Sequence, residues 1–428
     1  MATVEGTRRF LSRAAARGAL HPGNVRTLKR TDLSCSAIGF GGYRVGGGKE
    51  QDEHRAAILS AIRAGVNLLD TSSHYTASWE AADAHGASER LIGQLIADAV
   101  AAGDASRDEL IVCTKVGHAP GGVTPEGSVP VSDSGNRDHW HSIAPGFVDS
   151  EIRASCERLG TVPDFVLLHN PEYFLQDQLL RRVSIADAWD AMYDQLQQTF
   201  STMESLCQEG LIGSGYGVSA NFLSCMNSVS GRPNLYEALV VDRVLDAARV
   251  AAGGRDAHHL QVVQLPLNIV ESAALLGRPV IPEATEGDVP VVERLGLSTI
   301  TNRPLNAIPV PGVSSGDWEG PKLTHLRLKD AKPMGAIPQL LKRVVQGALG
   351  EEAGINAAQM TLQQLSLRLA SSTPAVSCTL LGMRRQQYVD DAEAVLKLPP
   401  LAPEIVARAH HSVRSCFEEL GGQHSSLW

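Results

Sequence analysis

Short apolar runs alternate with longer helix-like stretches along most of the chain after residue 29, and this alternation constrains the fold more than any other feature. The helix-like stretches include QDEHRAAILSAIRAG, SERLIGQLIADAVAAG and IADAWDAMYDQLQQTFSTMESLCQEG, and several end on glycine, which suits a left-handed helix cap. Strands separated by helices pair in parallel through right-handed crossovers. The candidate strands are Ser36–Phe40, Val66–Thr71, Leu110–Val116, Phe165–Asn170, Ser214–Ser219, Val262–Leu267, Leu297–Asn302 and Val376–Met383.

Eight such strands can close into a (β/α)8 TIM barrel, in which functional residues are expected at the carboxyl ends of the strands. An open, doubly wound sheet is the competing α/β arrangement. Its usual G-x-G-x-x-G turn is not matched by the glycine spacing of GFGGYRVGGG. We therefore predict an α/β protein with a TIM barrel over residues 29–428, which includes a C-terminal helical tail.

Some segments of the pattern exceed ordinary loop lengths. Gly117–Pro145 follows the third strand and residues 304–354 follow the seventh, with LLKRVVQGAL in the latter as a candidate short helix. On a barrel, Gly117–Pro145 and Pro304–Lys322 would be long loops over the C-terminal face, as substrate walls or a lid. Surface insertions without a part in the site are the alternative.

Composition indicates an ordinary globular protein of 428 residues, with 43% hydrophobic and 20% charged residues. The net charge of −9 argues against a nucleic-acid partner, and no apolar stretch approaches the length that spans a membrane. The seven cysteines are odd in number and never form a C-x-x-C pair. This pattern favours a reducing compartment such as the cytoplasm.

The N-terminal residues 1–28 form a basic extension in which Glu5 is the only acid. RRFLSRAAARGAL can form a basic amphipathic helix, as mitochondrial and plastid transit peptides do. A disordered or surface-docked extension is the alternative, and the sequence favours neither.

The stretch VNLLDTSSHY contains the first polar residues that packing does not explain. Asp70 ends an apolar run, where a carboxylate is costly unless it is paired, and Tyr75 follows five residues later. Lys115 ends the third strand and His169 ends the fourth. Each residue alone has a structural explanation, as an ion pair, a packed phenol or a satisfied histidine. Four titratable residues at one barrel mouth instead predict an active site.

The chemistry of these four residues is complementary. An ammonium near a phenol favours the phenolate and lowers its pKa, while a carboxylate keeps the ammonium charged and in place. An imidazole beside the phenol can orient a carbonyl and assist proton transfer. A tyrosine that exchanges a proton with a carbonyl or carbinol oxygen needs a hydride donor opposite, which implies a nicotinamide cofactor.

The motifs NLLDTSSHY, SERLIGQLI, CTKVG, ERLGTVPDFVLLHNPE, GYGVSAN, VVQLPLN and LLGMRR, in this order, closely resemble the aldo-keto reductase family. The resemblance extends from about Arg26 to the helix after Arg385. It implies a (β/α)8 barrel and a metal-free NAD(P)(H)-dependent oxidoreductase that acts on a small carbonyl or alcohol. The family's catalytic tetrad corresponds to Asp70, Tyr75, Lys115 and His169, with Tyr75 as the general acid or base.

The resemblance also implies cofactor contacts. Ser219, Asn221 and Gln264 correspond to residues that hold the nicotinamide carboxamide, with Asn268 as a weaker candidate. Without the resemblance, each is an ordinary hydrogen-bonding amide or hydroxyl.

Arg384 and Arg385 resemble the residues that bind the adenosine phosphate after the eighth strand. Guanidinium groups suit a 2′-phosphate, so we expect NADP(H) rather than NAD(H). A basic pair at a solvated helix N-terminus is the alternative.

The sequence departs from the family after strand seven, where an aromatic residue often stacks on the nicotinamide. Asn302 and Arg303 stand there instead, and Arg303 offers a flat cationic surface. At the helix near Ala392, many family members have an acidic pair followed by asparagine, whereas this chain reads DDA. The adenine contact is therefore left open. The segment after Tyr75 is longer than usual, and its Trp79 is a candidate for the substrate pocket.

Two other classes of function remain to be compared with this prediction. A catalytically silent NADPH-binding barrel, acting as a redox sensor or an auxiliary subunit, would bind cofactor without turnover. A metal-dependent hydrolase needs ligand-spaced histidines at strand ends, and the sequence spacing shows none among His118, His139, His141, His258 and His259. The sequence leaves the substrate, the direction of reaction and the oligomeric state open.

Overall fold

Eight parallel strands close into a barrel in the computed structural model, which describes residues 1–78, 84–131, 139–220, 239–254, 256–276, 288–305, 336–350 and 359–420. The strands follow one another around the barrel in chain order, and the last pairs with the first through Thr379 and Ile38. The predicted TIM barrel is therefore confirmed and the open sheet is not. The barrel strands are β3 (Ile38–Gly41), β4 (Leu68–Asp70), β5 (Ile111–Val116), β8 (Phe165–His169), β9 (Gly215–Ser219), β10 (Leu260–Pro266), β11 (Ser298–Asn302) and β12 (Val376–Leu381).

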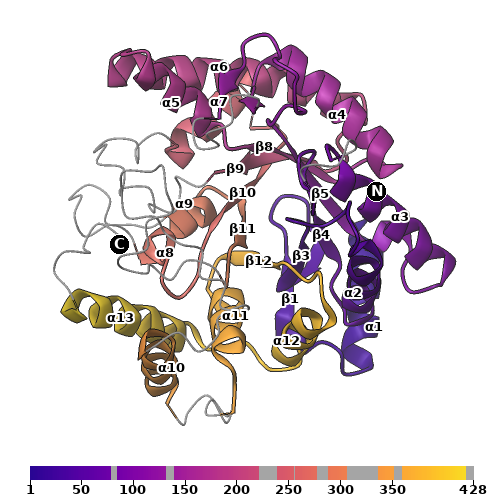
Figure 1. Ribbon diagram of the computed structural model, residues 1–428, viewed down its shortest axis with the longest axis vertical. Coiled ribbons are helices and arrows are strands. Elements are labelled where there is room, and N and C mark those ends of the chain that lie inside the picture. The colour runs from indigo at the N-terminus through magenta and orange to yellow at the C-terminus, as the bar shows by residue number, and fades with distance from the viewer. Residues whose placement is uncertain are drawn as a thin grey trace.

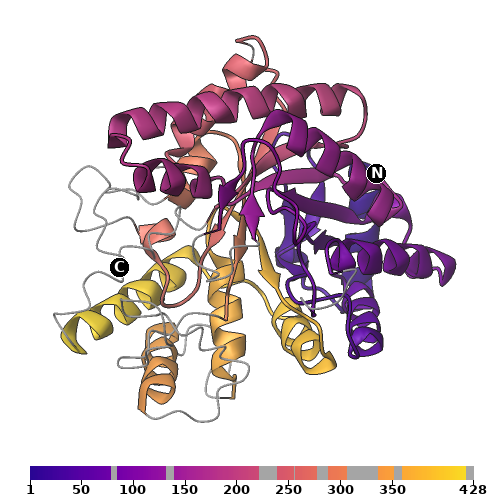
Figure 2. The same ribbon diagram turned by 45° about the horizontal axis from the view of Figure 1, so that its top comes forward.

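Helices cover the outside of the barrel, as the view toward its interior in Figure 2 shows. The three quoted helix-like stretches correspond to the observed helices Gln51–Arg63, Ala87–Ala101 and Ile185–Gln208. The C-terminal helical tail is α13, which packs against α10 below the barrel in Figure 1. The helices are α2 (Gln51–Arg63), α3 (Ala87–Ala101), α4 (Pro145–Leu159), α5 (Glu172–Leu180), α6 (Ile185–Gln208), α7 (Val241–Ala251), α8 (Ala273–Leu276), α9 (Asp288–Arg294), α10 (Ala336–Leu349), α11 (Leu362–Ser372), α12 (Gln386–Leu396) and α13 (Pro403–Leu420).

Alternate residues of the barrel strands point inward and form an apolar interior, because successive side chains of a strand face opposite sides. This cluster has no exposed members and includes cysteines as small apolar side chains. Its strand members are Leu68, Ile111, Cys113, Phe165, Leu167, Val262, Ile300, Cys378 and Leu380.

An antiparallel hairpin of β1 (Val25–Thr27) and β2 (Ser34–Ser36) closes the amino-terminal end of the barrel. Leu28, Leu33 and Cys35 of this hairpin join the same apolar cluster as the inward-facing strand residues. The carboxyl ends of the strands thus remain the open end.

The basic N-terminal segment packs on the barrel as helix α1 (Val4–Ala16). Its apolar face is in the core, with Phe10 and Leu11 each 1% exposed. Its basic face is paired with η2 (Arg107–Glu109), because Arg9 and Arg13 both form ion pairs with Glu109. The structure thus shows the docked arrangement, and a role of residues 1–28 in targeting stays a prediction.

Parts of both long segments belong to the described residues. Gly117–Pro145 contains a small antiparallel ribbon of β6 (Val129–Pro130) and β7 (Trp140–His141), while residues 132–138 lie outside the described residues. The short helix expected at LLKRVVQGAL is confirmed within α10, whereas residues 306–335 of the second segment also lie outside. None of the described helices has the length and apolar composition needed to cross a membrane.

We predict that Phe10→Ala lowers the free energy of unfolding by about 3–5 kcal/mol, because it removes a large aromatic side chain from the junction of α1 and the core. Urea unfolding followed by circular dichroism measures the change. Arg8→Ala, at an exposed position of the same helix, is the matched control and should unfold like the wild type. Equal stability of the Phe10→Ala protein would show that α1 adds nothing to the fold.

Candidate active site

A cavity of about 370 Å³ opens at the carboxyl ends of the strands. Its lining includes Asp70, Tyr75, His169, Ser219 and Gln264, all of which the sequence places at or just beyond strand ends. The same strands that carry the apolar interior thus supply the floor of the cavity. Three of these polar residues stand two positions after an inward-facing apolar residue, since Asp70 follows Leu68, His169 follows Leu167 and Gln264 follows Val262.

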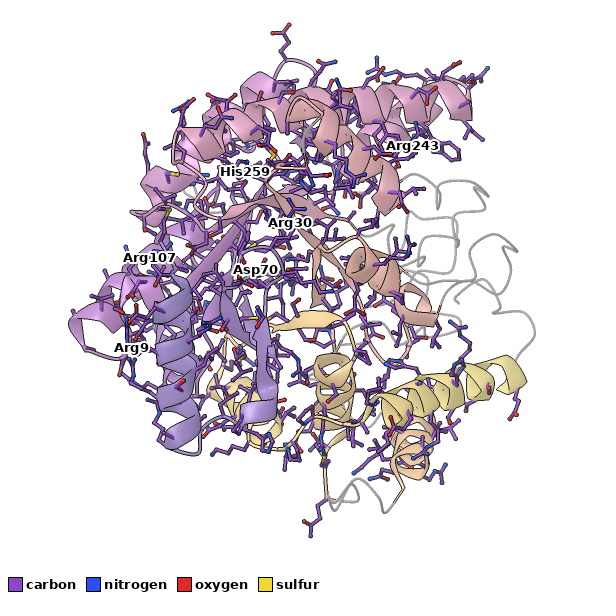
Figure 3. All side chains as sticks on the ribbon, turned by 180° about the vertical axis from the view of Figure 1, so that it is seen from behind. Arg9, Arg30, Asp70, Arg107, Arg243 and His259 are labelled. Atoms are coloured by element: carbon purple, nitrogen blue, oxygen red, sulfur yellow. The ribbon has the colours of Figure 1, made fainter. Side chains whose placement is uncertain are left out.

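A buried ion pair forms the centre of this floor. Lys115 Nζ lies 2.5 Å from Asp70 Oδ2 and donates a second hydrogen bond to the Thr71 carbonyl at 2.9 Å. Lys115 is fully buried and Asp70 is 2% exposed. Figure 3 shows Asp70 deep within the barrel, whereas Arg9 and Arg107 lie near its outer edge. Burial alone would lower the pKa of Lys115, but the adjacent Asp70 carboxylate raises it, so this lysine stays charged.

Tyr75 stands over this ion pair. Lys115 Nζ is 4.8 Å from the centre of the Tyr75 ring. Burial raises the pKa of Tyr75 to about 12, and Lys115 opposes this effect. The sequence correctly predicted that the Lys115 ammonium lowers the pKa of this phenol, but it did not predict that burial reverses the net shift. The desolvation of the phenol is larger than the attraction of Lys115, and Tyr75 is a neutral proton donor at neutral pH.

His169 lies next to Tyr75, with ring centres 5.6 Å apart and an edge-on arrangement. Its Nδ1 is 3.3 Å from Ser72 Oγ, and that hydroxyl also contacts the Lys115 carbonyl at 3.2 Å. Burial and the nearby His118 hold the pKa of His169 well below its usual value. A neutral imidazole beside the phenol can donate or accept a hydrogen bond at a substrate oxygen.

A chain of polar side chains links the neighbouring strands to Asp70. Ser219 Oγ donates to Gln264 Oε1 at 2.9 Å, and Gln264 Nε2 donates to Asp70 Oδ1 at 2.9 Å. Asn302 Nδ2 also donates to Gln264 Oε1, at 3.2 Å, while its buried Oδ1 has no hydrogen-bond partner among the described residues. Gln264 therefore holds the unpaired oxygen of the Asp70 carboxylate, and Asn302 Oδ1 remains as an acceptor for a ligand.

Three histidines gather on one side of the cavity. His74 precedes Tyr75, His118 follows β5 and His169 ends β8, and one nitrogen from each lies within 4.8 Å of the others. Burial lowers the pKa of His118 to about 3 and that of His74 well below the usual value. The sequence spacing predicted no ligand-spaced histidine pair or trio at strand ends among five histidines that include His118. This expectation is wrong for His118, because the neighbouring strands of the barrel bring it close to His74 and His169.

Arg303 enters the cavity wall just after β11 and adopts a left-handed backbone conformation, with φ of 57°. Its guanidinium is 4.0 Å from the buried carboxylate of Glu271. Burial raises the pKa of Glu271 to about 7, while Arg303 and the amide of Asn268 oppose this effect. Asn268 also accepts hydrogen bonds from the backbone of Val270 and Glu271, so it organises this loop and does not line the cavity.

The predicted phosphate-binding arginines occupy different surroundings. Arg384 lines the cavity, and it forms no ion pair among the described residues. Arg385, at the start of α12, lies 3.6 Å from Glu50 and 3.7 Å from Glu53. Two acids thus compete for Arg385, whereas Arg384 is available to an anion in the cavity.

The other predicted site residues divide into two groups. Ser219, Gln264 and Arg303 line the cavity with Asp70, Tyr75 and His169, while the fully buried Lys115 lies behind Tyr75. Asn221 and Trp79 lie outside the described residues. Sequence analysis missed the cavity residues His74, Tyr43 and Tyr173. The rule that function follows strand ends would have found His74, since it stands beside Tyr75, but nothing in the sequence marks the two tyrosines.

Comparisons with known proteins concern the family and the fold. Residues 37–239 match the sequence model described as the Aldo/keto reductase family. The fold resembles an aldo-keto reductase from Bacillus halodurans in its holo form, with a TM-score of 0.52 and 19% identity over 92% of this chain and 95% of that one. No curated protein matches the sequence.

Two structures from Klebsiella pneumoniae show the same likeness of fold. An aldo/keto reductase in complex with NADP and acetate has a TM-score of 0.53 at 18% identity, over 90% of this chain and 94% of that one. An aldo-keto reductase in complex with NADPH has a TM-score of 0.51 at 18% identity, over the same shares of the two chains.

We predict that Asp70→Asn lowers the free energy of unfolding by about 3–5 kcal/mol, because it leaves the fully buried Lys115 ammonium without its counter-charge. Urea unfolding at neutral pH measures this loss. Asp246→Asn breaks an exposed ion pair with Arg249 and is the control, expected to behave like the wild type. If both variants unfold alike, the Lys115–Asp70 pair is not a determinant of stability.

Proposed function

Because residues 37–239 belong to the aldo/keto reductase family, we propose that this chain is an NADP(H)-dependent oxidoreductase that interconverts a carbonyl and its alcohol. The proposal rests above all on one observation. Tyr75 and His169 face the cavity directly above the buried ion pair of Lys115 and Asp70. The substrate is an aldehyde, a ketone or a sugar hydroxyl.

Tyr75 is proposed as the group that moves the proton. Its raised pKa keeps the phenol protonated at neutral pH, which suits a general acid in carbonyl reduction. The Lys115 ammonium, 4.8 Å from the ring centre, stabilises the phenolate that remains after proton donation. Asp70 holds that ammonium in place through the 2.5 Å contact. In alcohol oxidation the same phenolate would accept the proton.

His169 is proposed to position the substrate oxygen near Tyr75. Its neutral imidazole has one nitrogen beside Ser72 Oγ, so the other is available to the cavity. A hydrogen bond from this side and one from Tyr75 would fix a carbonyl oxygen between the two groups. A fixed oxygen in turn determines which face of the carbonyl carbon is exposed to hydride.

The described residues fit a nicotinamide cofactor. Asn302 Oδ1 is a buried acceptor without a partner among the described residues, beside Ser219 and Gln264, and it suits an amide N–H donor such as a carboxamide. When bound, the cofactor supplies the hydride. Arg384 would contact the adenosine phosphate, and Arg303 would present its guanidinium to the cavity wall. NADP and NADPH in the two Klebsiella structures support the choice of the phosphorylated cofactor.

We predict that Tyr75→Phe reduces turnover by at least about 100-fold, because it removes the proton donor but keeps the ring. NADPH oxidation against a panel of aldehydes, ketones and sugars measures turnover, and NADPH fluorescence titration should give an unchanged Kd. The matched control is Tyr193→Phe, which should keep its turnover. The hydroxyl of Tyr193 accepts a hydrogen bond from the Val240 backbone, and Tyr193 does not line the cavity.

Retained turnover in the Tyr75→Phe protein would contradict the proposed role of the phenol. If the wild-type protein binds NADPH but oxidises it against no member of the panel, the chain is instead a catalytically silent NADPH-binding barrel.

We predict that Arg384→Gln raises the Kd for NADPH by about tenfold or more and leaves the Kd for NADH nearly unchanged, because a charge-assisted hydrogen bond to phosphate is worth about 1.5–3 kcal/mol. Fluorescence titration with each cofactor gives the two constants. Arg385→Gln should have a smaller effect, since Glu50 and Glu53 already contact that side chain.

Arg249→Gln, in an exposed ion pair on α7, is the control for the general loss of one positive charge. Wild-type protein that binds NADH as tightly as NADPH would rule out a phosphate-binding role for Arg384 and Arg385.

A further inference from the structure

The histidine cluster of His74, His118 and His169 has a composition that the proposed reaction does not require. Carbonyl reduction needs one imidazole beside Tyr75, and His169 supplies it. The two additional rings lie close to it, with ring centres 4.9 Å apart for His74 and His169 and 5.2 Å apart for His118 and His169. Three imidazoles with convergent nitrogens are the ligand set of many open zinc sites.

The barrel brings these three residues together. β4, β5 and β8 are neighbours in the closed sheet, and each histidine stands at the carboxyl end of one of them or in the loop just after it. Their candidate ligand nitrogens lie within 4.8 Å of one another. In tetrahedral coordination with Zn–N bonds of about 2.0–2.1 Å, two nitrogens are about 3.3 Å apart. The nitrogens must therefore approach by about 1.5 Å at most, and His74 and His118 are only half-buried.

Polar contacts hold the three rings in place. Ser72 Oγ lies 3.0 Å from His74 Nδ1 and 3.3 Å from His169 Nδ1, so one hydroxyl fixes the orientation of both rings. Asn170 Nδ2 donates to Glu172 Oε1 at 3.0 Å, which directs Asn170 Oδ1 toward His118 Nε2 at 3.5 Å. A metal-binding histidine is characteristically held by such a hydrogen bond at its other nitrogen.

We propose that His74, His118 and His169 bind one divalent transition-metal ion of the zinc type, and that the bound ion inhibits carbonyl turnover by competing with the substrate. The metal-binding part is independent of the reaction, and the inhibitory part rests on the proposed function. The set contains three nitrogen donors and no carboxylate, which favours Zn²⁺ over Mg²⁺ or Ca²⁺. All three residues line the cavity, so the fourth coordination position faces solvent or substrate.

Inhibition is expected because His169 belongs both to the proposed metal site and to the proposed site for the carbonyl oxygen. Coordination of His169 would occupy the nitrogen that is proposed to contact the carbonyl oxygen. The ion would also lie close to Tyr75, whose ring centre is 4.9 Å from that of His74 and 5.6 Å from that of His169. A bound ion and a carbonyl oxygen therefore cannot occupy the same space between these rings.

The test uses full-length, tag-free protein without cofactor, because an affinity tag of histidines would itself bind the metal. Cobalt chloride titration followed by visible absorption detects tetrahedral Co²⁺, and calorimetry with zinc chloride gives stoichiometry and Kd. We expect one ion per chain. His118→Asn and His74→Asn should each raise the Kd for Zn²⁺ by at least about tenfold. His411→Asn, at an exposed position of α13, is the matched control and should bind like the wild type.

Kinetics and one further variant separate this inference from the proposed function. Zn²⁺ should raise the KM for the carbonyl substrate and leave kcat unchanged, and His118→Asn should weaken this inhibition by at least about tenfold. Tyr75→Phe should lose turnover and still bind Co²⁺. Absence of a saturable site in wild-type protein, or an affinity that His118→Asn and His411→Asn change equally, would overturn the metal site even if NADPH turnover is normal. Inhibition that is not competitive would overturn the inhibitory part alone.

Discussion

The ion pair between Lys115 and Asp70 is the interaction on which the site depends. Two charges within a barrel are costly unless each is paired and hydrogen-bonded. Here Lys115 has Asp70 at 2.5 Å and the Thr71 carbonyl, while the other Asp70 oxygen accepts from Gln264. The pair is held because the Thr71 carbonyl and the Gln264 amide each provide a further hydrogen bond to one of its charged groups. Once Lys115 is fixed, the position of a positive charge beneath Tyr75 is fixed as well.

Several barrel strands contribute both to the apolar interior and to the polar floor of the active site. Leu68 and Asp70 are two residues apart on β4, and Cys113 and Lys115 are two apart on β5. The lower members belong to the apolar interior and the upper members to the active-site floor. An inward-facing position is therefore apolar or polar according to its height in the barrel. The stability of the fold and the polarity of the site are consequences of one alternating pattern.

Much of the fold and site follows from local sequence. Each of the eight predicted strands lies in the barrel, because a buried parallel strand is a short apolar run that needs no distant information. The docking of α1 could not be predicted from local sequence in the same way. A basic amphipathic helix has the same sequence pattern whether it targets an organelle or packs on a core. Glu109 is the partner of both Arg9 and Arg13 and is about a hundred residues away, so only the folded chain reveals the pairing.

By itself, the sequence determined the order of strands and helices, the polar residues at the strand ends, and the match of residues 37–239 to the aldo/keto reductase family model. The tertiary structure alone decided the balance at Tyr75, where burial raises the pKa more than Lys115 lowers it. It also decided that His118 joins His74 and His169, and that Arg384 rather than Arg385 faces the cavity. Desolvation and the distances between strands depend on closure of the barrel, and neither is encoded in any local stretch of residues.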